Sequence, residues 1–169
     1  YTPFRLARLV SFRDPFAPEF ELSSGWQLSN ALIGIGRGDL FGIGLGNSIQ
    51  KNLYLPEPHT DFIFAIILEE TGIIGGFLLM LLFVLLITSI VQISFDALRQ
   101  NRLFQGYVCF GIGSLLSIQS IFNIGVNIGL LPTKGLTLPF ISYGGASLII
   151  FMLMMGIVFR VDFENRNLD

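Results

Sequence analysis

Three long apolar stretches dominate the chain after residue 60, and short polar links separate them. They cover about residues 61–95, 104–131 and 141–160, and the first is densest from Phe77 to Ile93. A helix needs about 20 mainly apolar residues to cross a bilayer. The pattern therefore predicts three transmembrane helices, at residues 61–95, 104–131 and 146–160.

Residues 1–60 follow a different pattern, with a Gly-rich middle and scattered basic residues. Within them, Trp26 to Ile35 places apolar and small polar residues at roughly helical spacing, yet this segment is too short to cross a membrane. We expect a re-entrant or interfacial helix there; the alternative is an ordinary loop on the membrane surface. The predicted fold is an all-α polytopic membrane protein. Because the chain starts at Tyr1 rather than Met, we expect it to be a fragment whose earlier spans precede it.

Composition supports the membrane assignment and excludes other classes. Hydrophobic residues make up 52% of the chain and charged residues only 13%, whereas soluble domains carry about 25% charged residues. The net charge of −2 argues against nucleic acid as a partner, because phosphate binding needs a surplus of Lys and Arg. The single cysteine, Cys109, cannot form an internal disulfide.

The distribution of arginines predicts the orientation in the membrane. Arg99 and Arg102 lie in the short segment 96–103. Arg160 directly precedes the tail 161–169, which contains Arg166. Short cytoplasmic segments are rich in Lys and Arg. We therefore expect these two segments in the cytoplasm, and the loops 1–60 and 132–145 on the outer side.

The first predicted membrane helix begins with a cluster of polar residues. Glu57, His59 and Asp61 lie within five residues at the end of a Pro-containing loop. A carboxylate at a membrane edge lies in a reduced dielectric, which suits a general base. Alternatively, Thr60 or Asp61 caps the helix, and the two roles are compatible. One His with two carboxylates is a weak metal signal, although Mg²⁺ or Mn²⁺ could bind here beside a phosphate substrate.

Polar residues also occur within the predicted spans. Glu69 and Glu70 lie at membrane depth, where a carboxylate has either a function or a buried polar contact. Gln119, Asn123 and Asn127 recur every four residues and therefore share one helix face. This amide stripe could line a polar path through the membrane, but such residues more commonly join helices by hydrogen bonds.

Several basic residues are expected on the outer side, namely Arg5, Arg8, Arg13, Arg37, Lys51 and Lys134. Such residues often only contact anionic lipid head groups. Lys134 is the most specific candidate, because the Pro132–Gly135 sequence places one cation in a tight loop between two spans. There it could hold a pyrophosphate as a point charge.

Two stretches resemble the signatures of the SEDS family (shape, elongation, division and sporulation): LPEPHTDFIFA at residues 55–65 and GLLPTKGLTLPFISYGGAS at residues 129–147. The resemblance extends over essentially the whole chain. The sequences of residues 133–139 and 46–51 are similar to those of the division branch of the family. The resemblance implies a ten-span protein, of which this chain would be the large outer loop, spans eight to ten and the tail. Leu68 stands where the family usually has Gly, which argues against close helix approach there.

The resemblance also implies a function, namely the polymerisation of lipid II into glycan strands with release of undecaprenyl pyrophosphate. The protein would work at the septum in the bacterial inner membrane, beside a class B penicillin-binding transpeptidase and other division proteins. Asp61 matches the essential carboxylate of the family. The candidates for substrate binding are Arg5, Lys51, Glu57, His59, Thr133, Lys134 and Ser142.

Two other functions remain open at this point. A lipid II flippase would need a polar path, which the amide stripe together with Glu69 or Glu70 could supply. A scaffold that only positions the transpeptidase would not need Asp61 at all.

Overall fold

The computed structural model describes residues 25–48, 61–132 and 135–167. This part of the chain folds into helices without any strand: α2 (Trp26–Gly38), α4 (Ile63–Arg99), α5 (Leu103–Asn127) and α6 (Gly145–Asn167). By length and composition, α4, α5 and α6 are apolar enough to cross a membrane. The predicted all-helical fold with three membrane helices is therefore confirmed.

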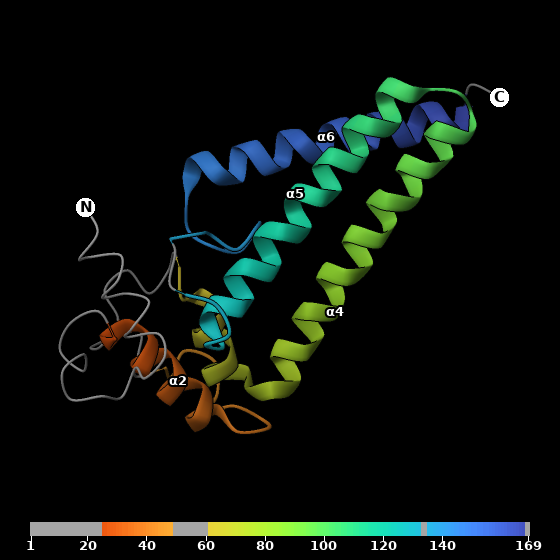
Figure 1. Ribbon diagram of the computed structural model, residues 1–169. Coiled ribbons are helices and arrows are strands. Elements are labelled where there is room, and N and C mark those ends of the chain that lie inside the picture. Colours follow the sequence, from red (N-terminus) through yellow and green to blue (C-terminus); the bar gives the residue numbers. More distant parts are fainter. Residues whose placement is uncertain (1–24, 49–60, 133–134, 168–169) are drawn as a thin grey trace, which may run out of the picture.

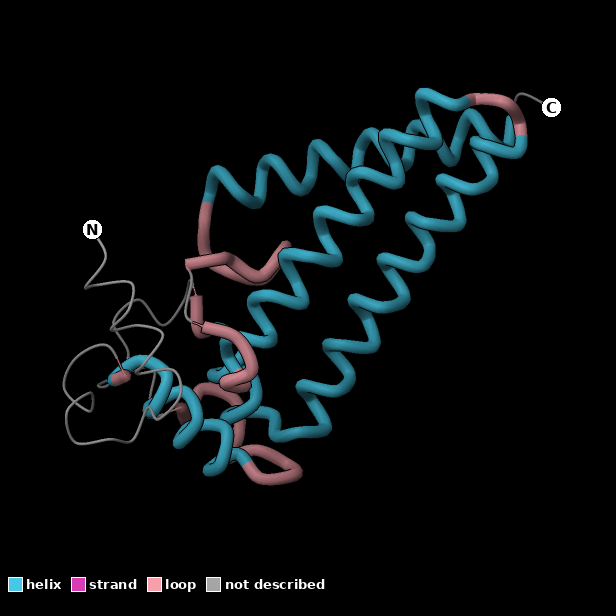
Figure 2. The backbone as a smooth tube through the Cα atoms, viewed as in Figure 1, coloured by secondary structure: helices cyan, strands magenta, loops and turns pink. Residues whose placement is uncertain are grey.

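The helices form an elongated bundle (Figures 1 and 2). α4 and α5 run antiparallel and side by side, and α6 crosses them near the end where the C-terminus lies. α2 packs against the first part of α4 at the opposite end. The helix expected at Trp26–Ile35 is confirmed and continues to Gly38. Leu28 and Ala31 are buried, so this segment is not a surface loop.

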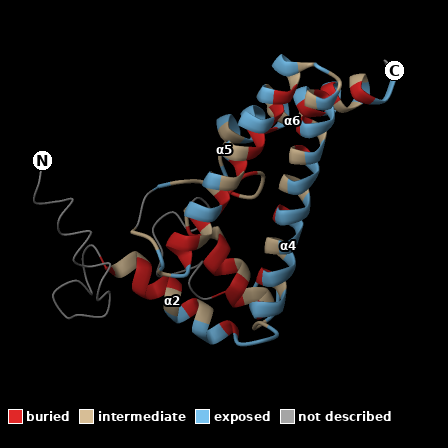
Figure 3. Cartoon of the chain, turned by 45° about the vertical axis from the view of Figure 1, so that its right-hand side comes forward, coloured by how far each residue is buried: buried red, intermediate tan, exposed pale blue. Residues whose placement is uncertain are grey.

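Buried side chains concentrate at two places along the bundle (Figure 3). The larger core joins α4, α5 and α6 and consists of Ile90, Ala97, Cys109, Ile112, Leu116, Phe151, Val158 and Val161. The second region joins α2, the start of α4, the end of α5 and the loop before α6, through Ala31, Phe62, Phe64, Ala65, Leu68, Val126 and Leu138. This second region supports the residues around Asp61.

α4 is broken at Gly72, which has φ 71° and ψ −175°. A break leaves backbone N–H and C=O groups without helical partners, and these groups need other partners at membrane depth. The segment after α2 supplies them through four hydrogen bonds: Ile43 N–H to Glu69 O (3.0 Å), Gly44 N–H to Glu70 O (3.1 Å), Ile73 N–H to Asp39 O (3.0 Å) and Ile74 N–H to Leu40 O (3.3 Å). The apolar pattern does not indicate this break.

The helices extend beyond the apolar stretches that predicted them. α4 continues to Arg99 and α5 begins at Leu103, so only residues 100–102 lie between them. Asn101 makes this tight reversal with a φ of 60°, a conformation that Asn tolerates. α6 continues to Asn167 through most of the predicted tail, where i,i+4 ion pairs support it.

α2 approaches the first part of α4 closely at Leu68, contrary to the expectation from the missing Gly. The glycine that allows this approach is Gly38 of α2, because a Cβ at this position would lie 2.2 Å from the Leu68 carbonyl oxygen. The absence of Gly at position 68 therefore does not prevent close packing.

Candidate functional site

Asp61 lies just before α4, where the loop enters the bundle. The N-cap position is Phe62, and the first turn contains no acidic residue. The expectation that Asp61 falls in the first turn is therefore wrong. Phe62 and Phe64 are 3% and 1% exposed, while Asp61 itself is half-buried. The buried rings of Phe62 and Phe64 thus anchor the backbone next to Asp61.

The start of α4 is capped by a residue of another helix. Ala65 is the third residue of α4, and its N–H donates to Asn127 Oδ1 at 3.0 Å. In most helices the side chain at the N-cap accepts this bond, but Phe62 cannot. Asn127 of α5 therefore takes the capping role that was predicted for Asp61 or Thr60; Thr60 itself lies outside the described residues.

The backbone of Asp61 is held by the amide stripe of α5. The Asp61 carbonyl oxygen accepts from Asn127 Nδ2 at 2.9 Å and from Asn123 Nδ2 at 3.2 Å. The same Asn123 amide donates to the Leu136 carbonyl, and Gln119 Nε2 donates to the Thr137 carbonyl at 3.0 Å. The stripe therefore joins helices and loops, which is the commoner of the two predicted roles.

The loop before α6 passes beside the Asp61 carboxylate. A Cβ on Gly135 would lie 3.0 Å from Asp61 Oδ2, so the loop approaches this oxygen closely at a residue without a side chain. Further along, Leu138 is 1% exposed and anchors the loop in the core. The Ser142 hydroxyl accepts from Leu138 N–H at 2.7 Å, and Ser142 N–H donates to Leu138 O at 3.0 Å. These bonds give Ser142 a local role in the turn, while its predicted contact with substrate stays a prediction.

Glu69 makes one of the buried polar contacts that were considered for it. Its side chain is fully buried, and its Oε2 accepts from the Ser48 hydroxyl at 2.5 Å. Oε1 of Glu70 is also buried and has no hydrogen-bond partner among the described residues. Asn123 and Asn127 are as buried as Glu69. In the described part of the chain, Glu69, Asn123 and Asn127 therefore hold elements together and do not line an open polar path.

Most of the predicted substrate-binding residues lie outside the described residues: Arg5, Lys51, Glu57, His59, Thr133 and Lys134. Thr133 and Lys134 immediately precede Gly135, and residues 57–59 shortly precede Asp61 in the chain. Within the described ranges, no group of three or more His, Cys, Asp or Glu residues could hold a metal. A divalent cation at the site stays a prediction.

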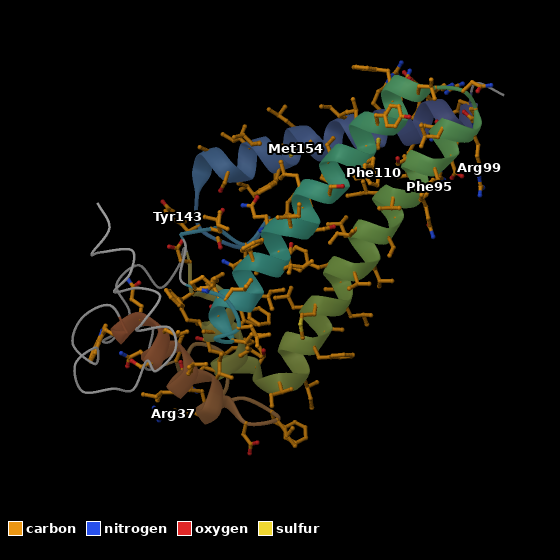
Figure 4. All side chains as sticks on the ribbon, viewed as in Figure 1. Arg37, Phe95, Arg99, Phe110, Tyr143 and Met154 are labelled. Carbon is orange, nitrogen blue, oxygen red and sulfur yellow. The ribbon has the colours of Figure 1, made fainter. Side chains whose placement is uncertain are left out.

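Labelled side chains show how the site relates to the rest of the bundle (Figure 4). Arg37, in the last turn of α2, and Tyr143, just before α6, lie toward the end of the bundle that carries the site. Arg99 lies at the opposite end, close to the C-terminus. The site thus occupies the end of the bundle opposite the arginine-rich link.

Comparisons with known proteins show the family to which the chain belongs. A profile of the family FTSW_RODA_SPOVE, described as "Cell cycle protein", matches residues 1–167. A relative from Coxiella burnetii, named "Probable peptidoglycan glycosyltransferase FtsW", is 55% identical over 166 residues, which are 98% of this chain and 44% of that protein. A relative of the same name from Marinomonas mediterranea is also 55% identical, over 96% of this chain and 40% of that protein.

A solved structure described as "Structural coordination of polymerization and crosslinking by a peptidoglycan synthase complex" has the same fold. It is 28% identical, with a TM-score of 0.70, and the match covers 98% of this chain and 43% of that one. The chain thus spans less than half the length of the curated relatives it matches, and it corresponds to their carboxy-terminal part. The profile match over nearly all residues and the identity of about one half place this chain in the FtsW/RodA/SpoVE family of cell cycle proteins.

Proposed function

We propose that the protein whose carboxy-terminal part is this chain is a peptidoglycan glycosyltransferase that polymerises lipid II during cell division. The observation that carries the proposal is the placement of Asp61. Its backbone is fixed by Asn123 and Asn127, and the Gly135 loop passes beside its carboxylate. The relatives named FtsW, at 55% identity, support the choice of reaction.

In the proposed reaction, the Asp61 carboxylate takes the proton of a sugar hydroxyl on lipid II. The oxygen attacks the anomeric carbon of the growing glycan chain, and a new C–O bond forms. The bond from that carbon to undecaprenyl pyrophosphate breaks, and the pyrophosphate leaves with the electron pair. In-line attack inverts the anomeric carbon and requires both substrates to be held in register.

The leaving pyrophosphate needs a cation beside it. Lys134 is our first candidate, because it directly precedes Gly135, whose Cα adjoins the Asp61 carboxylate. Lys51 and Arg5 are further candidates. Mg²⁺ or Mn²⁺ could add charge neutralisation, and omission of divalent ions from the polymerisation assay tests this contribution separately.

We also propose an orientation and a location. The arginines at the α4–α5 link and at the end of α6 would face the cytoplasm, which places Asp61 at the outer edge of the inner membrane, at the division septum. Both substrates carry a lipid tail in the bilayer and a sugar head outside it, so a carboxylate where loop and helix meet suits them. A class B penicillin-binding transpeptidase would be the partner, in keeping with the synthase complex of the related structure.

The buried contacts support a polymerase over the two other functions. A flippase needs a polar path, but Asn123, Asn127 and Glu69 are at most 1% exposed and make hydrogen bonds to other parts of the fold. A scaffold would not need a carboxylate with a fixed backbone. The proposed enzyme needs such a group.

The test uses the full-length protein, purified with its transpeptidase partner and supplied with labelled lipid II. Asp61→Asn keeps the shape of the side chain and removes the base. Asp96→Asn is the matched control, because Asp96 is exposed and pairs with Arg99 at the other end of α4. We expect glycan polymer from the wild type and from Asp96→Asn, and none from a normally folded Asp61→Asn protein. Equal polymer from all three proteins would refute Asp61 as the base, and no polymer from any would favour the flippase or the scaffold.

A further inference from the structure

The two amide side chains that hold Asp61 are not equivalent. The hydrogen bonds of Asn127 in the described structure join its own helix to the start of α4 and the residue before it: it caps Ala65, donates to the Asp61 carbonyl and donates to the Asn123 carbonyl. Asn123 instead bridges two chain segments, because its Nδ2 donates both to the Asp61 carbonyl and to the Leu136 carbonyl. The Asn123 amide nitrogen therefore donates on both sides of the site, to Asp61 just before α4 and to the loop before α6.

The segment that Asn123 holds is the one beside the carboxylate. Leu136 directly follows Gly135, whose Cα adjoins Asp61 Oδ2. One amide group of α5 thus connects the backbone of Asp61 to the backbone of the Gly135 loop. The Asn123 side chain is 1% exposed, while its two acceptors belong to the half-buried residues Asp61 and Leu136. Loss of the amide would remove this donor from the Leu136 carbonyl.

We propose that Asn123 is a positioning residue for the transfer reaction, which sets the distance between the general base and the loop at Gly135 and Leu136. This inference rests on the proposed function of Asp61. The Asn123 amide donates to main-chain carbonyls on both sides of the proposed site, so it would act through the backbone. Removal of its amide leaves Asp61 anchored by Asn127, so the loop moves relative to the base while the start of α4 remains capped.

The chain offers a matched control one helical turn away. Gln119 lies on the same face of α5 and donates to the carbonyl and hydroxyl of Thr137 in the same loop. It makes no bond to Asp61 in the described structure. Gln119→Ala therefore loosens the loop further from the carboxylate, whereas Asn123→Ala breaks the link between the loop and the residue that bears the base.

The test measures lipid II polymerisation by the full-length protein with its transpeptidase partner, in the wild type, Asn123→Ala, Asn123→Asp and Gln119→Ala. Displacement of a reacting group by about 1 Å lowers rates by about 100-fold. We expect a kcat loss of that order for both Asn123 variants with KM nearly unchanged, because substrate binding does not use this amide. Asn123→Asp keeps the size of the side chain but loses the donor, so it separates the hydrogen bonds from packing. Gln119→Ala should stay close to the wild-type kcat.

Hydrogen exchange of the peptide spanning 132–138 is measured on the same samples and does not depend on activity. We expect faster exchange in the Asn123 variants. Unchanged exchange and unchanged kcat would overturn the positioning role while leaving the proposed function intact. An equal loss of kcat in Gln119→Ala would also overturn it, because the link to Asp61 would then be irrelevant. No polymer from the wild type would overturn the proposed function and the catalytic role of Asn123 with it, even if exchange changed as expected.

Discussion

Two glycines with similar positive φ values allow a sharp test of the break in α4. Gly42 and Gly46 have φ values of 78° and 83°. A Cβ on Gly42 would lie 2.1 Å from the Glu70 carbonyl oxygen, whereas a Cβ on Gly46 would meet nothing within 4 Å. Alanine at either position carries the strain of the left-handed region. Only Gly42→Ala also forces the 39–44 segment away from the break.

The expected magnitudes follow from these two effects. A left-handed L-residue costs about 1–2 kcal/mol, and this is the whole expected loss for Gly46→Ala. Gly42→Ala should additionally lose the bonds of Ile43 and Gly44 to the Glu69 and Glu70 carbonyls, each contributing about 0.5–1.5 kcal/mol net. We therefore expect Gly42→Ala to be more destabilising than Gly46→Ala by about 1–3 kcal/mol, the sum of those two bonds.

The assay is equilibrium unfolding of the full-length protein in mixed micelles, followed by circular dichroism as a denaturing detergent is added. Gly36→Ala serves as a third arm, because Gly36 lies within α2 and its Cβ would meet no neighbour. This variant should be more stable than the wild type by about 0.5–1 kcal/mol. Equal free energies of unfolding for Gly42→Ala and Gly46→Ala would refute the packing of the 39–44 segment into the break of α4.

Three further predictions concern single contacts. Gly135→Ala should lower the polymerisation rate several-fold without loss of folding, because its methyl group would stand 3.0 Å from Asp61 Oδ2; Gly145→Ala, with an open surrounding, is the control, and equal rates would contradict the proximity. Ser94→Ala should lower the free energy of unfolding by about 1 kcal/mol, because the buried hydroxyl donates to the Gly106 carbonyl at 2.8 Å. Arg160→Ala should change that free energy by less than about 0.5 kcal/mol, since its 2.9 Å pair with Glu164 is largely exposed on the arginine side; a loss of several kcal/mol would show a buried role.

The sequence pattern predicted the number and order of the membrane helices because burial in lipid requires long apolar runs. It also predicted the helix at Trp26, since helical spacing of small and apolar residues persists where a segment packs on its neighbours. It did not predict the break at Gly72. Glycine is common in membrane helices, and only the partner segment 39–44 shows why this one departs from helical geometry.

The placement of the three amides on α5 was predictable, but the partners of their hydrogen bonds were not. The spacing of Gln119, Asn123 and Asn127 correctly placed the three amides on one face of one helix. The acceptors of their hydrogen bonds are backbone carbonyls, and carbonyls carry no sequence signal. For the same reason, the sequence predicted that a residue next to α4 would cap it. The cap is Asn127, more than 60 residues later in the chain.

The way α5 holds Asp61 suits the role of general base that we propose for it. Donors that bond to a carboxylate stabilise its ionised form and weaken it as a base. The two bonds from α5 go instead to the main-chain carbonyl of Asp61, so they fix the position of the residue without drawing charge from its carboxylate. The glycine at 135 allows the loop to approach Oδ2 with no polar side chain of its own. Asn123 and Asn127 would therefore supply the orientation that the proposed reaction requires through bonds to the backbone of Asp61, and these bonds leave the charge of its carboxylate unaltered.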